Sequence, residues 1–589
     1  MKRFIISFLG ALAGVWVSVL IFGVLMIMMI AVAAASSTNP ADIPNVKKHS
    51  VLTITLAGEI TDRERPMDIM SEIYGIETQT IPLNTLVASI KKAADDKDIE
   101  GIYLDCKGVS AGLAQIQSIV CALKEFSESG KWIMAYGDTY TQGDYVIASV
   151  SDSLFVNPAG MIDIHGLSST TMYFKNLLDK AGIDVQVVKV GTYKSAVEPF
   201  TLTEMSEANR LQTTTFLNNI WSCVSGDIAE GRRVDTATVN SWADSYLFSQ
   251  PAEHYISNGI ADAMLYRHEM ETLLASASGL DDDKPNLISF DKYALARNID
   301  GNTGNGSKNI AVLYALGDIT ESGEGGIESD KLVPQILDIA ENDNIDALVL
   351  RVNSGGGSAY ASEQIWEALQ QFKSKTGKPF YVSMGDVAAS GGYYISCGAD
   401  CIYAEPVTLT GSIGIFGLIP NAQKLLNDKI GINTATVTTN EGQFPNLFTP
   451  MTQGQSSAMQ AYVDRGYELF VKRCADGRGM SVDSIKAIAE GRVWDGRKAM
   501  EIGLVDRMGG LESAIADIAD QIGAADDYRV TEYPKIKFKW WEEILQMGKT
   551  VEASAVRSAL GENARFYETV KAIQNMDAVQ ARMDFIEVK

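Results

Sequence analysis

Two halves of the chain follow the same pattern, and this internal duplication constrains the fold more than any other feature of the sequence. Segments found between residues 51 and 262 recur in the same order between residues 310 and 506. The paired segments are 51–60 with 310–319, 99–105 with 345–351, 135–149 with 383–396, 177–183 with 426–432, and 247–262 with 493–506. Five ordered matches indicate a duplication, so both halves are predicted to form the same kind of domain.

Each half alternates strand-like apolar runs with helical spacing. In the second half, residues 345–352 and 380–384 are predicted to be buried strands, and residues 361–372 between them have the apolar periodicity of a helix. This order predicts an α/β fold with a largely parallel sheet in each half. The predicted domains are a first half at 39–300, a linker at 301–307, a second half at 308–530 and a tail at 531–589.

The N-terminus carries an apolar run that is long enough to span a membrane. Lys2 and Arg3 precede residues 4–35, which contain no charged side chain. A membrane-spanning helix needs about 20 apolar residues, whereas the apolar core of a cleaved signal peptide has about 7–15. We predict one transmembrane helix within residues 1–38, with a cleaved signal peptide as the alternative. Positive charge stays on the cytoplasmic side, so the remaining chain is predicted to lie outside the cytoplasm.

Composition excludes several classes of protein. The chain has 50 Lys+Arg and 74 Asp+Glu, and a formal net charge of −24 disfavours binding to nucleic acid. Six cysteines in 589 residues are too few for a disulfide scaffold. The four histidines do not occur in a metal-like spacing, so the sequence predicts neither a metal nor another cofactor.

Two loops of the second half have the composition of a hydrolase site. Residues 353–358 contain three consecutive glycines directly after a predicted strand. The N–H groups of such a loop can form an oxyanion hole or a phosphate cradle, and a plain turn is the alternative. Ser390 begins an apolar helix after the next strand, where the N–H of Gly391 can complete an oxyanion site. This serine is either a helix cap or a nucleophile.

A second serine motif is a weaker candidate. Gly108-Val-Ser110-Ala-Gly112 formally matches G-x-S-x-G and follows a predicted strand. Glycine and serine are common in turns, so we interpret Ser110 as part of a strand-end loop.

A nucleophilic serine needs a base. The second half contains no histidine, and His165 lies in the first half. The alternative base is a lysine held neutral by burial, for which Lys194 is a candidate because apolar and aromatic residues flank it.

Several segments together resemble the signal peptide peptidase A (protease IV) family in its long, duplicated form. They are residues 193–200, 353–358, 389–393, 409–414 and 491–506. The likeness covers nearly the whole chain after the predicted anchor. It implies tandem Clp-protease/crotonase-like domains and a Ser–Lys dyad. Gly355 departs from the family, whose members often have proline at this position.

The resemblance also implies a role for each site residue. Ser390 corresponds to the nucleophile, Lys194 to the general base and Ser412 to the residue that orients the lysine. The implied oxyanion hole consists of Gly356, Gly357 and Gly391.

The repeat alignment explains why the two dyad members lie in different halves. Ser390 aligns with Gln142 in the first half, and Lys194 aligns with Gln443 in the second. Each half has kept one member, which predicts one composite site per chain.

The predicted function is that of a membrane-anchored serine endopeptidase. The resemblance implies signal-peptide remnants and other apolar peptides as substrates, and a homotetramer. The N-terminal apolar run and its flanking charges predict a single-pass protein of the inner membrane, with its catalytic body in the periplasm if the source is a Gram-negative bacterium. A catalytically inactive peptide-binding scaffold of the same fold is the main alternative. A crotonase-type acyl-CoA enzyme is a second alternative, which the predicted topology disfavours because acyl-CoA is cytosolic.

The tail contains a basic and aromatic segment at residues 533–541. Lys535, Lys537 and Lys539 alternate there with apolar side chains. The pattern is typical of an edge strand, and it also suits contact with the headgroups of a lipid bilayer.

Overall fold

The computed structural model describes residues 10, 14–18, 20–24, 44–65, 80–280, 284–299, 306–323, 326–525, 527–535 and 579–583. Most of the predicted anchor, and residues 301–305 of the predicted linker, lie outside these ranges. Within them, no helix is both long enough and apolar enough to cross a membrane.

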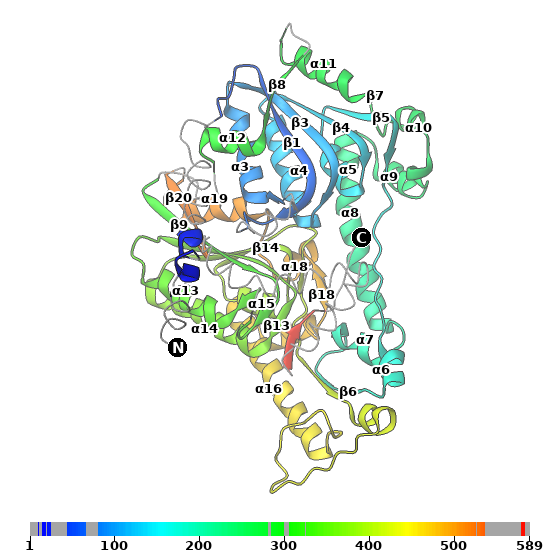
Figure 1. The fold of residues 1–589 in the computed structure, drawn as a ribbon, viewed down its shortest axis with the longest axis vertical. Coiled ribbons are helices and arrows are strands. Elements are labelled where there is room, and N and C mark those ends of the chain that lie inside the picture. The colour runs from blue at the N-terminus through cyan, green and yellow to red at the C-terminus, as the bar shows by residue number, and fades with distance from the viewer. Residues whose placement is uncertain are drawn as a thin grey trace.

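The first half forms the upper lobe of Figure 1, a parallel sheet covered by helices. Its strand order is β2-β1-β3-β4-β5-β7, and β8 pairs with β1. The strands are β1 (Ser50–Thr61), β2 (Thr80–Pro82), β3 (Ile99–Ser110), β4 (Trp132–Tyr140), β5 (Ser153–Ile162), β7 (Ala263–Met264) and β8 (Asn286–Ser289). The helices are α3 (Leu83–Asp95), α4 (Leu113–Ser127), α5 (Gln142–Ala148), α9 (Thr236–Ala243), α10 (Ala252–Ser257), α11 (Arg267–Ala277) and α12 (Phe290–Arg297).

The second half repeats this layout below it, with the strand order β18-β16-β14-β12-β9-β20. Its strands are β9 (Lys308–Leu316), β12 (Ala347–Ser354), β14 (Phe380–Ala389), β15 (Cys401–Ala404), β16 (Leu409–Gly411), β18 (Val493–Asp495), β19 (Arg507–Met508) and β20 (Tyr528–Tyr533). Its helices are α13 (Ser329–Glu341), α14 (Ala359–Thr376), α15 (Gly391–Ser396), α16 (Gln453–Arg478), α17 (Val482–Ile488), α18 (Gly496–Glu501) and α19 (Leu511–Gln521).

The predicted strand–helix–strand unit of the second half is confirmed. β12 and β14 pair in parallel, and α14 connects them. The apolar face predicted for this helix is buried, namely Ile365, Ala368, Leu369 and Phe372. An apolar stripe at this spacing has to be covered, so it packs α14 into the core of the second half.

β20 pairs in parallel with β9, as β8 does with β1 in the first half. This strand therefore runs across the predicted boundary between the second half and the tail at residue 530. Of the basic and aromatic segment, the structure describes residues 533–535, and residues 536–541 lie outside the described ranges.

One excursion of the first half is built into the second. β6 (Asp184–Lys189) leaves the upper lobe and pairs antiparallel with β17 (Phe416–Asn421) of the second half. The chain then continues through α7 (Glu198–Thr201) and returns to the upper lobe along α8 (Glu207–Arg232), the long helix beside both lobes in Figure 1. Residues 190–206 consequently lie against the second half, although they belong to the first in sequence.

β6 and β17 belong to a third sheet, with the order β11-β10-β13-β21-β17-β6. Its other strands are β10 (Ile319–Thr320), β11 (Ile327–Glu328), β13 (Gly356–Ser358) and β21 (Val579–Arg582). This sheet joins the glycine-rich loop, the first-half excursion and the C-terminal segment.

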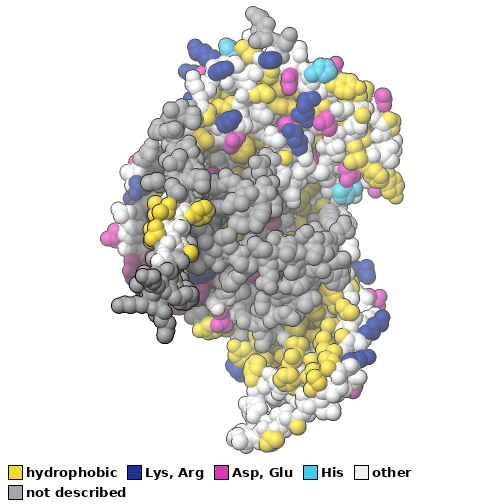
Figure 2. All heavy atoms as spheres, in the orientation of Figure 1, with side chains coloured by type: hydrophobic (Ala, Val, Ile, Leu, Met, Phe, Trp, Pro, Cys, Tyr) yellow, Lys and Arg dark blue, Asp and Glu magenta, His cyan; other side chains and the backbone are white. Residues whose placement is uncertain are grey.

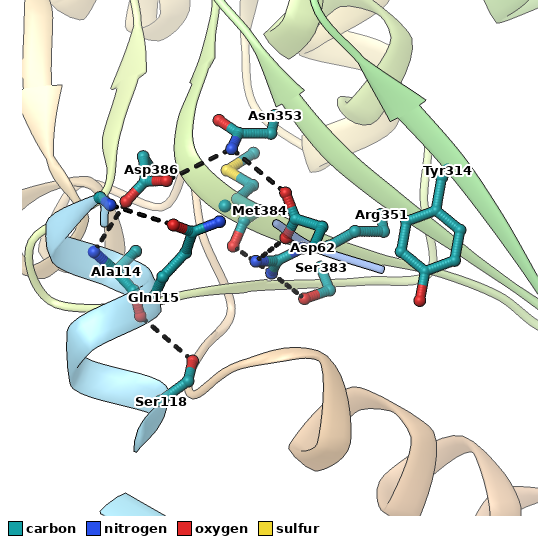
Figure 3. A network of polar contacts seen from close by, with 12 residues as sticks. Asp62, Ala114, Gln115, Ser118, Tyr314, Arg351, Asn353, Ser383, Met384 and Asp386 are labelled. Atoms are coloured by element: carbon teal, nitrogen blue, oxygen red, sulfur yellow. Dashed lines mark hydrogen bonds and ion pairs between the residues drawn. The ribbon is translucent and has the colours of Figure 1, made fainter. Parts of the chain in front are cut away.

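A buried polar network joins the two lobes (Figure 3). The guanidinium group of Arg351, on β12, contacts the Asp62 carboxylate at the end of β1, with an Nη2–Oδ1 distance of 2.7 Å. The carboxylate of Asp386 accepts a 2.8 Å hydrogen bond from the N–H of Ala114 at the start of α4. Burial raises the pKa of Asp386, and the nearby Asp62 carboxylate adds to this shift. Because these charges are removed from water, each needs its partner in the other half.

Candidate active site

Ser390 lies at the turn from β14 into α15, with backbone angles of φ 54° and ψ −112°. A non-glycine residue rarely adopts positive φ, and such strain is stored where the surrounding structure fixes it. Here the N–H of Ser390 donates to the carbonyl of Gly411 at 2.8 Å, which ties the turn to β16. The side chain is fully buried.

Lys194 approaches this serine from the first-half excursion. After β6, the N–H of Val190 donates to the carbonyl of Ile415, and the N–H of Tyr193 donates to the carbonyl of Glu490. These bonds carry the chain along the second half, so the lysine side chain points inward and is only 1% exposed. Its Nζ donates to Ser390 Oγ at 2.7 Å.

Ser412 contacts the same amine. Its Oγ lies 3.1 Å from Lys194 Nζ, and its carbonyl oxygen lies 3.0 Å from that nitrogen. Ser412 also has positive φ, at 49°, and its N–H donates to the carbonyl of Arg492. The structure thus brings the three polar residues predicted from the sequence into one hydrogen-bonded group.

The glycine-rich loop lies beside the start of α15. A β-carbon placed on Gly356 would lie 2.7 Å from the nitrogen of Gly391, so only glycine allows this approach. Gly356 and Gly357 also have positive φ, at 101° and 159°. The N–H of Gly356 donates to the hydroxyl of Ser354 at 3.1 Å. The N–H group of Gly356 is therefore already used, and this glycine serves to let the loop approach Gly391 closely. Of the three glycines predicted to form the oxyanion hole, Gly357 and Gly391 remain as N–H donors.

The residues that hold the lysine segment in place were not predicted from the sequence. Gln212, on α8, donates to the carbonyl of Tyr193 and accepts the N–H of Val493 from the second half. Glu198 is buried and accepts hydrogen bonds from Ser206 and Asn209. Glu198 lies four residues after Lys194, and a glutamate within an apolar stretch was the one available signal for this network.

The equivalent place in the first half keeps a pocket of about 500 Å³ but lacks the serine, and the polar groups at the positions of the nucleophile and the oxyanion loop are already paired. Gln142 stands at the position of the nucleophile and accepts the N–H groups of His165 and Gly166. The carboxylate of Asp144 accepts hydrogen bonds from the N–H groups of Gly108 and Val109. These two donors, in the loop that corresponds to residues 353–358, are therefore not available to a substrate. Burial raises the pKa of Asp144, and these hydrogen bonds oppose that shift.

The weaker candidates do not join the site. Ser110 is exposed at the end of β3, and Gln443, the counterpart of Lys194, is exposed in the loop before α16. Among the described residues, no group of three or more His, Cys, Asp or Glu side chains is arranged to hold a metal ion.

Comparison with known proteins places this chain in a family. The sequence profile of peptidase family S49 matches residues 125–281 and 372–525, one segment in each half, and the Clp protease profile matches residues 322–406. "Protease 4" of Haemophilus influenzae is 34% identical over 498 residues, which is 82% of this chain and 80% of that protein.

Two further relatives extend the comparison. "Protease 4" of Salmonella typhi is 33% identical over 485 residues, or 80% of this chain and 78% of that protein. "Serine protease SPPA, chloroplastic" of Arabidopsis thaliana is 30% identical over 482 residues, or 80% of this chain and 69% of that protein. With its duplicated Clp-protease-like α/β domains, the chain belongs to peptidase family S49 and is a serine peptidase.

Proposed function

We propose that the chain is a membrane-anchored serine endopeptidase with Ser390 as nucleophile and Lys194 as general base. The observation that carries the proposal is the 2.7 Å hydrogen bond from Lys194 Nζ to Ser390 Oγ between two buried side chains. A nucleophile in contact with a base, itself oriented by a third polar group, is the arrangement that activates a serine. Ser412 is that third group.

The lysine amine accepts the hydroxyl proton only when it is itself unprotonated. The side chain of Lys194 is buried, and burial disfavours the ammonium form of an amine. The amine takes the Ser390 proton as the serine oxygen attacks the peptide carbonyl carbon, and it returns this proton to the leaving amine. The N–H groups of Gly357 and Gly391 stabilise the oxyanion that forms.

The proposed substrates are signal-peptide remnants and other apolar peptides. A pocket of about 610 Å³ supports this class, because it lies beside the glycine-rich loop and includes aromatic and apolar side chains. Those side chains are Ala359, Tyr360, Phe444, Met459 and Tyr462.

The lower lobe carries exposed apolar side chains that support a homotetramer. Hydrophobic side chains gather on its surface in Figure 2. Exposed apolar side chains of the chain include Leu177, Ile430, Ile432, Val437 and Phe444, with Val437 96% exposed. Clusters of this kind are typical of surfaces that contact another chain or a membrane. In the proposed arrangement, residues 4–35 anchor each subunit in the inner membrane and the body lies in the periplasm.

Substitution of the nucleophile tests the proposal. Ser390→Ala is expected to abolish hydrolysis of an apolar fluorogenic peptide and labelling by a fluorophosphonate probe, because alanine fits the site but cannot be acylated. The matched control is Ser110→Ala, which should keep both activities. Full hydrolysis by Ser390→Ala would refute the assignment.

A further inference from the structure

The pocket of about 500 Å³ in the first half has mostly apolar walls, to which both halves contribute. The apolar side chains that line it include Leu113, Ile116, Leu167, Ile220, Val387 and Leu409. Ser110 and His165 also line the pocket and are exposed, so the pocket is open to solvent. A pocket of this size with mostly apolar walls and a few polar groups is the usual form of a ligand site.

One wall of the pocket corresponds to the glycine-rich strand beside the nucleophile. The repeat places Ser110–Gly112 opposite Gly356–Ser358, which form β13. The strand pairing agrees with this alignment, because Ser110 pairs in parallel with Glu59 of β1, as β13 pairs in parallel with β10. On its other side β13 pairs with β21.

The opposite wall corresponds to the start of β17. The amide of Gln142, which stands at the position of Ser390, donates to the carbonyl of Gly166 at 2.9 Å. In the second half, Ser390 Oγ donates to the carbonyl of Gly414 at 3.4 Å. Gly166 is therefore the counterpart of Gly414, and Leu167 begins the counterpart of the segment that leads into β17. The pocket thus lies where β21 lies in the second half, between the counterparts of β13 and β17.

Main-chain groups on both walls are available to a peptide backbone. Among the residues that the structure describes, the N–H and C=O groups of Ala111 and Leu167 make no hydrogen bond to another main-chain group. Half-buried main-chain groups need partners, and an extended peptide supplies them by adding a strand beside each wall. Such main-chain contacts give affinity, and the apolar walls select apolar side chains.

The pocket binds without the means to cleave. Gln142 replaces the nucleophile, and the carboxylate of Asp144 already accepts the N–H groups of Gly108 and Val109. A peptide held here consequently meets neither an attacking hydroxyl nor free oxyanion donors from these two residues.

We propose that this pocket is a second peptide-binding site, which holds an extended, apolar segment of a long substrate while another part of the same peptide is cut at Ser390. This inference rests on the proposed function of Ser390 and Lys194. The two sites share strands, because Val387 and Leu409 of the pocket lie three residues before Ser390 and Ser412. Three residues of extended chain span about 10 Å, so a peptide of about 20 residues is long enough to occupy both sites.

The test compares a long and a short substrate of the full-length chain. The long peptide is apolar and has about 20 residues, the length of a membrane-spanning segment, and the short peptide is its cleaved sequence alone. Ala111→Trp places a large side chain in the pocket. The ratio of kcat/KM for the long peptide to kcat/KM for the short peptide is expected to fall about 10-fold, because burial of one apolar side chain favours binding by about this factor or more.

Two further variants make the comparison specific. Leu167→Asp puts a charge in the apolar wall and should lower the same ratio. Ala159→Trp adds the same side chain as Ala111→Trp at an exposed position on β5, outside the pocket, and should keep the wild-type ratio. The thermal unfolding midpoint of each variant serves as the control for folding.

Photo-cross-linking locates the bound segment. A long peptide with a diazirine at its uncut end, bound to the Ser390→Ala chain, is expected to label residues 109–116 or 165–167. Label confined to the second half would overturn the second site.

The kinetic outcomes separate this inference from the function on which it rests. A wild-type chain that hydrolyses both peptides, together with folded Ala111→Trp and Leu167→Asp chains that keep the wild-type ratio, would overturn the second site and leave the peptidase assignment intact. A wild-type chain that fails to hydrolyse the short peptide would refute the proposed function itself.

Discussion

Replacement of Lys194 tests the proposed chemistry most directly. Lys194→Met keeps much of the length and apolar character of the side chain but removes the amine. The Nζ–Oγ distance of 2.7 Å corresponds to direct proton transfer, without an intervening water. General base catalysis contributes about 10²–10⁴-fold to a rate. Among the described residues, Lys194 is the basic side chain in contact with Ser390 Oγ, so we expect the upper part of this range. We expect kcat/KM to fall by about 10³–10⁴-fold, or about 4–5.5 kcal/mol of transition-state stabilisation.

Lys194→Arg separates the loss of the base from the loss of positive charge. A guanidinium group keeps its proton at any working pH, so this variant is expected to be as inactive as Lys194→Met. The wild-type rate should rise toward alkaline pH, because a larger fraction of the amine is then unprotonated and able to accept the serine proton.

The assay is kcat/KM for a soluble fluorogenic peptide, measured across neutral and alkaline pH. The thermal unfolding midpoint of each variant serves as the control for folding. A folded Lys194→Arg protein with substantial activity would refute the reasoning, because it would show that another group accepts the serine proton.

Three further predictions concern the rest of the chain. Arg351→Met leaves the buried carboxylate of Asp62 without its cationic partner, so the free energy of unfolding measured in urea should fall by about 3–5 kcal/mol. An unchanged unfolding midpoint would contradict the role given to this ion pair. Gln142→Ser in a Ser390→Ala background should not restore hydrolysis, because the carboxylate of Asp144 already accepts the N–H groups of Gly108 and Val109. Recovered hydrolysis would show that these N–H groups can stabilise an oxyanion. Protein lacking residues 1–38 should bind anionic vesicles at low salt, and substitution of Lys535, Lys537 and Lys539 by glutamine should abolish this binding. If the protein without residues 1–38 does not bind vesicles at any ionic strength, residues 533–541 have only a structural role.

Much of the fold could be predicted because its signals are local. The apolar periodicity of residues 361–372 specifies a helix, and the neighbouring apolar runs specify strands, whatever the rest of the chain does. The duplication could be recognised because matching segments recur in the same order. Ser390 and the glycine-rich loop could be proposed from local residue patterns, whereas the roles of Lys194 and Ser412 followed from the family resemblance. The absence of a histidine from the second half already indicated a base from elsewhere in the chain.

Long-range contacts decided the remainder. No local pattern indicates that β6 leaves its own half to pair with β17, and this crossing is what brings Lys194 to Ser390. The positive φ of Ser390 and the hydrogen bond that occupies the N–H of Gly356 arise from neighbours that pack against the turn and the loop.

The C-terminal segment shows the same division. No strand was predicted for residues 579–583, because Val-Gln-Ala-Arg-Met lacks the mostly apolar run that indicates a buried strand at residues 380–384. They become a strand only because β13 and β17 offer unpaired edges on either side, and an edge binds any extended backbone that reaches it. The sequence by itself therefore determined the two α/β domains and the chemical groups of the site. The tertiary structure decided how those groups meet and where β21 lies, because both depend on contacts between residues about 200 or more positions apart.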